Sequence, residues 1–146
     1  MNFTTSFIEV DLTIPCHEIS LGLQKIIQNH LEKKYQNKAF ETYGVIRKIN
    51  KINKLIYHHI SNIEGNLFMV YEIEVEHYIP KIYDTITLPI KKILSCGLFL
   101  EEQHFKILVS QVDSDYQENE FIPVTLTDIR FEKDAFHCLA KIANQD

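Results

Sequence analysis

Residues 67–79 read LFMVYEIEVEHYI, and this stretch decides the fold of the first half of the chain. Its residues alternate between two sets, which is the pattern of a β-strand with two different faces. One set comprises Met69, Tyr71, Ile73, Val75 and His77, and the other comprises Phe68, Val70, Glu72, Glu74 and Glu76. We therefore expect a long strand over residues 67–79.

The residues upstream predict a strand followed by a helix. Residues 7–12 alternate in the same way and predict a strand with one apolar face, which Pro15 ends. Apolar residues then recur at helical spacing over residues 23–35, and Ser20 is the expected N-cap. The first half of the chain therefore begins with a strand and an amphipathic helix.

The segment between this helix and the long strand is less regular. Residues 43–51 predict a strand with imperfect alternation, and residues 51–54 predict a turn because the asparagines around them tolerate turn conformations. Residues 55–60 predict a short strand, and the stretch from Ser61 to Asn66 predicts a loop.

Pro80 marks the expected boundary between two modules, residues 1–79 and residues 80–146. The second module is expected to hold five short strands, over residues 82–94, 98–101, 105–110, 122–126 and 135–142. Residues 111–120 form an acidic loop between the third strand and the fourth, and residues 128–134 join the last two. Five short strands predict a closed barrel of the OB type, so the expected fold class is α+β.

The composition is that of a folded soluble protein. Of the 146 residues, 45% are hydrophobic and 24% are charged. We expect the chain to be soluble and intracellular, because it shows no signal peptide and no apolar run of the roughly 18 residues that span a bilayer. The three cysteines are far apart and form no CxxC pair, which predicts free thiols in a reducing compartment.

Charge is spread unevenly although the formal net charge is only −5. Residues 25–54 hold eight basic and two acidic residues, whereas residues 101–120 hold six acidic residues and one lysine. These blocks are either solvated faces or docking surfaces of opposite sign.

Two groups of residues contain side chains that could form a catalytic or a metal site. The run Cys16–Glu18 contains a cysteine and a histidine, but adjacent side chains on an extended segment point apart, which argues against a nucleophile pair. His58 and His59, with His77 or Cys16, lack the spacing of a structural zinc site.

The acidic loop and the glycines offer no site either. Asp113, Asp115 and Glu118 lack the glycine and the terminal glutamate of a calcium loop. The chain contains neither a P-loop nor a GxGxxG motif. We therefore expect no catalytic residue, no metal and no cofactor.

The second module is the better candidate for a binding function. OB-type barrels bind single-stranded nucleic acid by stacking bases on aromatic rings beside a basic groove. The predicted RNA-binding residues are Lys91, Lys92, Phe99, Phe105 and Lys106. The alternative for each phenylalanine is that its ring fills the barrel interior. Acidic residues outnumber basic ones eleven to seven over residues 81–146, so RNA binding should be weak and sensitive to salt.

Three stretches, in this order and spacing, resemble the large stalk subunit of multisubunit DNA-directed RNA polymerases. They are residues 12–35, residues 43–72 with their YGVI and FMVYE segments, and residues 80–99 with their GLF segment. Asp134-Ala135-Phe136 and the apolar residues after it are similar to a large DNA virus, poxvirus-like, version of this family.

The resemblance implies a truncated RNP-like tip domain at the N-terminus and an OB barrel at the C-terminus. It implies a non-catalytic subunit that docks on the polymerase core at the clamp base near the RNA exit and supports initiation and elongation. The implied core-docking residues are Pro15, His17, Glu18, Ile60, Ser61, Asn62 and Gly65.

The implied partners are the large polymerase core subunits and, weakly, nascent RNA, with no membrane contact; whether a small stalk partner exists stays open. A viral enzyme would place the chain in the cytoplasm, in a viral factory or virion, and a cellular one in the nucleus. The chain departs from the family at Tyr83, where a glycine is usual, and at residues 101–103, where acids replace a basic-aromatic wall.

Three other functions remain open beside the stalk subunit. The chain could be a free-standing RNA-binding or translation protein with an OB barrel. It could be a small thiol hydrolase that uses Cys16, or a scaffold of another complex.

Overall fold

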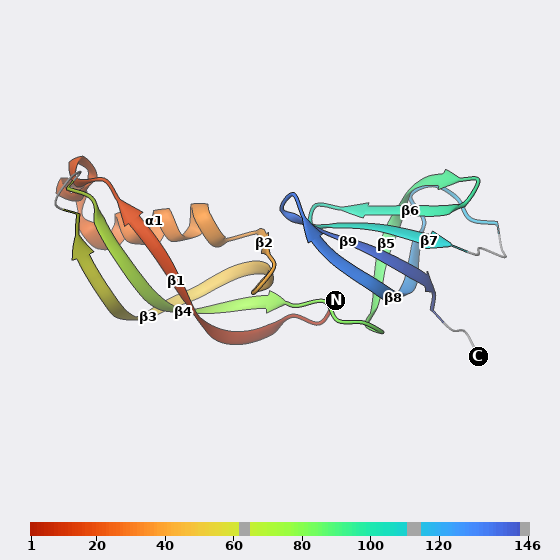
Figure 1. Ribbon diagram of the computed structural model, residues 1–146, viewed down its shortest axis with the longest axis horizontal. Helices are drawn as coiled ribbons and strands as arrows, with labels where there is room; N and C mark the ends of the chain where they lie inside the picture. Colours follow the sequence, from red (N-terminus) through yellow and green to blue (C-terminus); the bar gives the residue numbers. More distant parts are fainter. Residues whose placement is uncertain (62–64, 111–114, 144–146) are drawn as a thin grey trace. The chain divides into compact units, whose positions relative to one another are not determined.

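A computed structural model describes residues 1–61, 65–110 and 115–143 (Figure 1). The chain divides into two compact units. The sheet unit comprises residues 3–38 and 45–78, and the barrel unit comprises residues 1–2, 39–44 and 79–146. Within the described residues, no helix is long and apolar enough to cross a membrane.

The sheet unit is organised around the strand that the sequence identifies most clearly. β4 (Leu67–Tyr78) lies between β1 (Thr4–Ile14) and β3 (Gly44–Ile60), and β2 (Lys38–Phe40) follows β3 in the sheet order. β4 is antiparallel to both neighbours. The predicted alternation is confirmed, because Met69, Tyr71, Ile73, Val75 and His77 are buried and the residues between them are half-buried; Tyr78, at the end of the strand, is buried as well.

One helix covers part of this sheet. α1 (Leu23–Tyr35) buries Ile27, Leu31 and Tyr35 and contacts β1, where the Tyr35 hydroxyl donates a hydrogen bond to the Asp11 carbonyl oxygen at 2.7 Å. The predicted N-cap at Ser20 is wrong. A 3-10 helix, η1 (Cys16–Leu21), takes up that segment, and Gly22 caps α1 instead, with a φ of 101°.

The turn predicted at residues 51–54 is also wrong, because β3 is continuous from Gly44 to Ile60. Its pairing with β4 shifts register four times, so Arg47, Asn50, Asn53 and Ile56 are bulged residues with no residue of β4 opposite them in the register. β3 thus advances three residues for every two of β4. A β-bulge absorbs one extra residue in this way without ending the strand.

Because the bulges recur every third residue, the paired side chains of β3 also repeat every third residue on each face of the sheet. The residues opposite the buried positions of β4 are Ile46, Ile49, Ile52, Leu55 and His58. Lys48, Lys51 and Lys54 lie opposite Glu76, Glu74 and Glu72 on the other face. Opposite charges in such cross-strand pairs favour this register.

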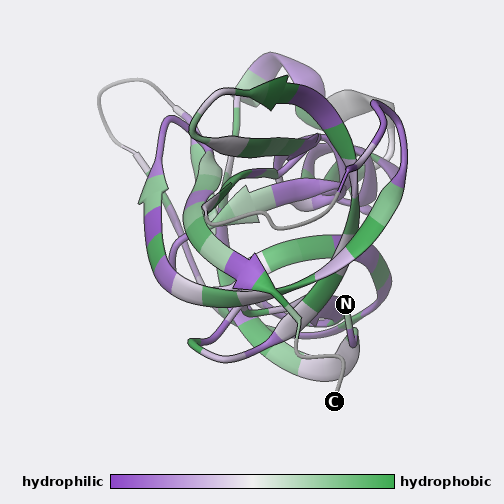
Figure 2. Ribbon diagram, turned by 90° about the vertical axis from the view of Figure 1, so that its right-hand side faces the viewer, coloured by the Kyte–Doolittle hydropathy of each residue, from purple (hydrophilic) through white to green (hydrophobic). Residues whose placement is uncertain are grey.

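The barrel unit holds a closed five-stranded barrel, consistent with the predicted OB-type barrel. Its strands are β5 (Thr85–Leu94), β6 (Gly97–Glu102), β7 (Phe105–Ser110), β8 (Phe121–Glu132) and β9 (Ala135–Ile142). The order is β5-β6-β7-β9-β8, β7 and β9 are parallel, and pairing of β8 with β5 closes the barrel. Apolar and polar residues alternate along these strands (Figure 2).

The link predicted over residues 128–134 is shorter than expected. β8 continues to Glu132, and Lys133 and Asp134, both with positive φ, alone connect it to β9. Register shifts after Leu126, so the alternation of the strand is broken there. Because of this bulge, the alternation of apolar and polar residues does not continue through the second half of β8, and the sequence pattern did not predict that half as a strand.

Gly97 lets β6 and β7 approach each other at their pairing end. It lies opposite Ser110 with a φ of 152°, and a Cβ added to it would lie 2.0 Å from the carbonyl oxygen of Val109. Backbone atoms cannot move aside as a flexible side chain can. The position therefore requires glycine.

We expect Gly97→Ala to lower the free energy of unfolding by about 3 kcal/mol, because the added methyl group forces the two strands apart. Gly22→Ala is the control, since it also has a positive φ but no atom lies within 4 Å of the added Cβ. It should lower the free energy of unfolding by about 1 kcal/mol through backbone strain alone. Urea denaturation followed by circular dichroism measures both, and equal losses would contradict the assignment.

Candidate functional site

Two of the predicted docking segments leave the sheet at the same end. β1 ends at Ile14 and β3 ends at Ile60, and both residues pair with Leu67, the first residue of β4. Pro15 and Ser61 follow directly on the two sides of this position. We call this the docking end of the sheet unit.

Gly65 and Cys16 bring these two segments into contact. A Cβ built on Gly65 would lie 3.5 Å from the Cys16 sulfur, and Gly65 has a φ of 69°, which favours glycine. The Ser61 amide donates to the Asn66 carbonyl oxygen, and the Gly65 amide donates to the Ser61 carbonyl oxygen, each at 2.9 Å. Asn62 lies outside the described residues.

The turn at residues 15–18 is held by the helix. The Glu18 amide donates to the Pro15 carbonyl oxygen at 3.0 Å, and the Glu18 carboxylate lies 2.9 Å from Nε2 of His30 on α1. His17 is exposed beside this pair. His30 therefore positions the turn, a role that sequence spacing did not indicate because the partners lie on different elements.

An exposed apolar and aromatic surface adjoins the docking end. Ile60 is 65% exposed, and the rings of Tyr57, His59 and Phe68 lie together, with centroids 5.2 to 6.3 Å apart. Tyr57 is also exposed. Exposed apolar patches of this kind mark interaction surfaces. The sequence signal was the segment LIYHHI over residues 55–60, which holds three adjacent apolar residues without alternation.

The outer surface of the barrel carries a second candidate site. Phe99 of β6 lies opposite Leu108 of β7, and Leu108 lies beside Leu139 of β9, which is 48% exposed. A hollow of about 380 Å³ lies over these residues. Two positively charged side chains, Lys106 and Arg130, line it together with the imidazole of His137.

Closure of the barrel brings these three side chains together. Lys106 lies beside His137 because β7 and β9 run parallel, and His137 lies opposite Arg130 because β9 pairs with β8. Neither Arg130 nor His137 was predicted as a binding residue. No local signal could have found them, since they come from strands distant in the sequence.

The predicted RNA-binding residues divide into surface and core. Phe99 and Lys106 both line the hollow, and Lys92, which is exposed, lies opposite Phe99. Lys91 is exposed in the bulge of β5. Phe105 was predicted as an RNA-binding residue, but the structure places it in the core. Its side chain is 1% exposed and its ring stacks on Phe136 with centroids 5.5 Å apart, so no base can reach it.

The electrostatics of the hollow are mixed. A carboxylate oxygen of Asp128 lies 3.7 Å from Nε of Arg130, and Glu101 lies opposite Lys106. Burial and the negative charge of Asp128 raise the pKa of the Cys138 thiol to about 12. The hollow can thus attract an anion only weakly, and Cys138 is not a nucleophile at neutral pH.

The described residues offer little for metal chemistry. No group of three or more histidine, cysteine, aspartate or glutamate side chains among them could hold a metal ion. His58 pairs with Met69 and His77 with Ile46, so the two histidines lie toward opposite ends of the ladder. Asp113 lies outside the described residues, and Asp115 and Glu118 are not clustered with a third ligand.

Neither a comparison with protein-family models nor a search of curated proteins found a match for this chain. The functional interpretation of the two sites therefore depends on their geometry alone.

We expect Cys16 and Cys96, which are exposed, to react with DTNB at pH 8 within minutes, and the buried Cys138 to react only on unfolding. The reason is that its raised pKa keeps the Cys138 thiol protonated, while burial blocks access to the sulfur. The Cys138→Ser variant should keep both fast-reacting thiols. Three thiols reacting at one rate would contradict the assignment.

Proposed function

We propose that the chain is a non-catalytic stalk subunit of a DNA-dependent RNA polymerase. It docks on the large core subunits at the base of the clamp, near the RNA exit, and supports initiation and elongation. The observation that carries this proposal is the meeting of the two predicted docking segments at one end of the sheet, with Gly65 beside Cys16. Segments far apart in the sequence thereby form one surface.

The strand order of the sheet unit supports a truncated RNP-like tip domain. β1, α1, β3 and β4 occur along the chain as a strand, a helix and two strands, with only the short β2 between α1 and β3, and β4 lies between β1 and β3 in the sheet. This is the arrangement of the first half of a β-α-β-β-α-β fold. No second α-helix occurs among the described residues, so the proposed RNP-like fold is truncated.

Tyr83 gives independent support, although it departs from the family pattern. Its φ is 73°, a conformation that glycine favours, at the position where the stalk family usually has glycine. The Tyr83 amide donates to the Leu126 carbonyl oxygen at 2.8 Å, and the Leu126 amide donates to the Asp84 carbonyl oxygen at 2.9 Å. The backbone therefore retains the turn that a glycine would make easily.

Docking would act on the clamp through differential binding. A subunit shifts the clamp toward closure only by as much as it binds the closed state more tightly. Ile60 and the aromatic cluster of Tyr57, His59 and Phe68 provide apolar area for such contacts. No residue of the chain takes part in nucleotide addition in this proposal.

The barrel makes a weaker contact with emerging RNA. Phe99 offers a partly exposed ring for stacking, and Lys92, Lys106 and Arg130 offer positive charge near it. Asp128 and Glu101 lie among these cations and reduce their attraction for phosphate. The contact is therefore salt-sensitive.

The hollow on the barrel favours one alternative, a free-standing RNA-binding protein with an OB-type barrel. In that case the barrel would be the main functional surface, and the docking end would have no large partner. Isolation of the complex separates the two functions.

We expect affinity purification of the tagged chain, from cells that produce it naturally, to recover the two largest RNA polymerase subunits. Ile60→Asp should reduce their recovery at least tenfold, because docking would bury an unpaired charge. Phe7→Asp is the matched control, since Phe7 is an exposed apolar residue on β1 and should leave recovery unchanged.

Recovery of ribosomes in place of polymerase subunits would overturn the stalk proposal and favour the free-standing alternative. Equal loss of recovery in both variants would overturn the assignment of the docking end.

We expect Phe99→Ala and Lys106→Glu each to weaken binding of a single-stranded oligonucleotide by roughly threefold to tenfold at low salt, the range set by loss of one stacking or phosphate contact. Lys81→Glu is the charge-matched control outside the hollow. Fluorescence anisotropy of a labelled oligonucleotide measures all three variants. An equal effect of Lys81→Glu and Lys106→Glu would show that binding follows net charge and not this surface.

A further inference from the structure

The hollow on the barrel lies over two rows of outward-pointing residues that cross four strands. β6, β7, β9 and β8 are neighbours in this order, so residues paired across them line up. The first row consists of Phe99, Leu108, Leu139 and Asp128. The second row consists of Glu101, Lys106, His137 and Arg130. All of these residues except Glu101 line the hollow.

The first row is an apolar floor that ends at a carboxylate. Phe99 and Leu108 are half-buried and Leu139 is exposed, so the floor is accessible from outside. From Phe99 to Leu139 it spans two strand spacings, about 10 Å, and Asp128 lies one strand further. Aromatic and apolar side chains on a sheet surface support nucleobases that lie flat on them.

The second row supplies positive charge beside this floor. Lys106 and Arg130 are exposed and lie two strands apart, again about 10 Å. A single strand of RNA that crosses β7, β9 and β8 can therefore place its phosphates over the second row and its bases over the first. OB-type barrels bind single strands with the same division between a basic groove and aromatic rings.

Asp128 does not fit a surface that only binds phosphate, because its carboxylate repels phosphate groups. Its ion pair with Arg130 is loose: the two groups lie 3.7 Å apart, and their side chains are 49% and 79% exposed. Exposed ion pairs of this kind contribute little free energy. The carboxylate is therefore accessible to a ligand in the hollow.

A bulge in β8 turns this carboxylate outward. The register shifts between Leu126 and Asp128, so Thr127 has no residue of β9 opposite it and Asp128 lies opposite Leu139. In an unbroken ladder Asp128 would lie opposite Cys138, which is buried. Bulges next to binding sites commonly redirect a side chain in this way.

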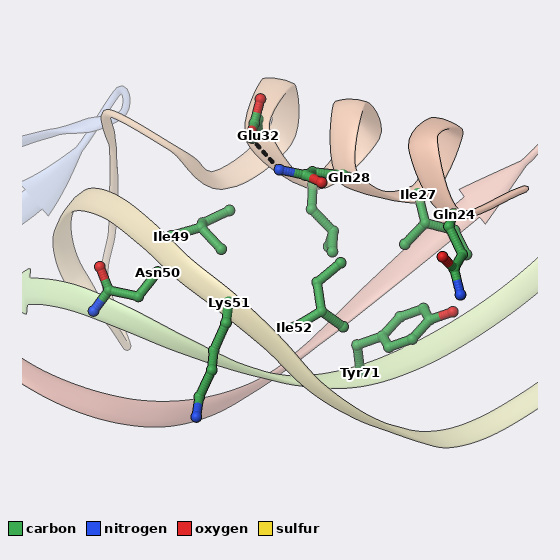
Figure 3. A pocket seen from close by; sticks show the side chains of 10 residues that line it. Gln24, Ile27, Gln28, Glu32, Ile49, Asn50, Lys51, Ile52 and Tyr71 are labelled. Atoms are coloured by element: carbon green, nitrogen blue, oxygen red, sulfur yellow. Dashed lines mark hydrogen bonds between the residues drawn. The ribbon is translucent and has the colours of Figure 1, made fainter.

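The larger hollow of the sheet unit lacks this combination. Its volume is about 500 Å³, and Ile49 and Ile52 point into it from β3 toward α1 (Figure 3). Tyr71, the aromatic residue of its lining, is buried. A base would find no exposed ring among the described residues that line it, so the barrel hollow is the better site for RNA.

A carboxylate beside a base distinguishes the four bases by their hydrogen-bonding groups. Ionised aspartate only accepts hydrogen bonds, through two oxygens. Guanine has two adjacent donors on its Watson–Crick edge, N1–H and the N2 amino group, which match these two oxygens. Adenine, cytosine and uracil each have an acceptor next to their donor on that edge, and the carboxylate repels this acceptor.

We propose that the barrel hollow binds a guanine base of single-stranded RNA, whose N1–H and N2 amino group donate hydrogen bonds to the Asp128 carboxylate. The guanine lies over Leu108 and Leu139, Phe99 stacks on the neighbouring base, and Lys106 and Arg130 contact the phosphates. This inference rests on the RNA contact of the proposed function and adds a base preference to it. Stacking and phosphate contacts alone are tolerant of sequence.

The test measures binding of labelled RNA to the full chain at low salt by fluorescence anisotropy. The probes are short oligouridylates whose central base is uracil, guanine, hypoxanthine, adenine or cytosine, and the guanine probe is also made as DNA. We expect the guanine probe to bind roughly fivefold to tenfold more tightly than the uracil, adenine and cytosine probes, the lower part of the range for a bidentate contact. Hypoxanthine keeps N1–H but lacks the amino group, so its probe should bind with intermediate affinity.

Two charge-matched variants of the chain give opposite predictions. Asp128→Asn removes a negative charge, so simple electrostatics would tighten binding of every probe. We expect the guanine probe to bind about fivefold more weakly to this variant, and the other probes to bind equally or more tightly. Glu101→Gln removes a negative charge outside the hollow and should tighten binding of all probes by the same factor. Circular dichroism checks that both variants are folded.

The outcomes separate this inference from the proposed function. Binding without a base preference, or a guanine preference that Asp128→Asn leaves unchanged, would overturn the guanine site and leave the RNA contact intact. No binding of any probe would overturn both.

Two further outcomes would assign the carboxylate to another group and overturn the proposal. If Asp128→Asn abolished a preference for RNA over DNA but no base preference, Asp128 would bind the ribose 2′-hydroxyl. If unlabelled GMP competed more strongly than the unlabelled guanine RNA, the hollow would be a site for a free nucleotide. We expect GMP to compete at least tenfold more weakly, because it lacks the neighbouring base that stacks on Phe99.

Discussion

The ladder between β3 and β4 is the constraint on which the sheet unit depends. β4 advances two residues for every three of β3, so one strand keeps a regular alternation while the other is bulged four times. This mismatch places Lys48, Lys51 and Lys54 opposite three glutamates and keeps the apolar residues of β3 on the face shared with α1. It also brings the end of β3 to Leu67, where the docking end forms.

The same ladder explains why this unit exposes so much apolar surface. β3 is a long strand whose second half is exposed, and α1 packs beside it on β1 and not over it. An isolated edge of this length would be prone to pair with other strands. Bulges remove the regular ladder but leave the apolar side chains accessible, which suits recognition through a face and not through an edge.

The barrel unit is constrained by closure of its sheet. Its strands close on themselves, so the interior is filled by apolar side chains such as Phe105, and only outward positions remain for binding. Closure gathers Lys106, His137 and Arg130 around Phe99, but Asp128 and Glu101 lie among them. A surface of this mixed charge is suited to a weak contact that a stronger docking interaction supports, which agrees with the proposed stalk role.

The sequence by itself determined the regular elements: the alternation of β4, the helical spacing of α1, and the five strand segments of the barrel, because each of these patterns is local. It misplaced the N-cap of α1, the middle of β3 and the second half of β8. There a 3-10 turn or bulges changed the period, and a bulge is stabilised by the partner strand, not by its own residues. Only the tertiary structure decided that Phe105 is buried while Phe99 is not, that Cys16 meets Gly65, and that Arg130 and His137 join Lys106. These outcomes depend on strand register and barrel closure, which are set by contacts between residues distant in the chain.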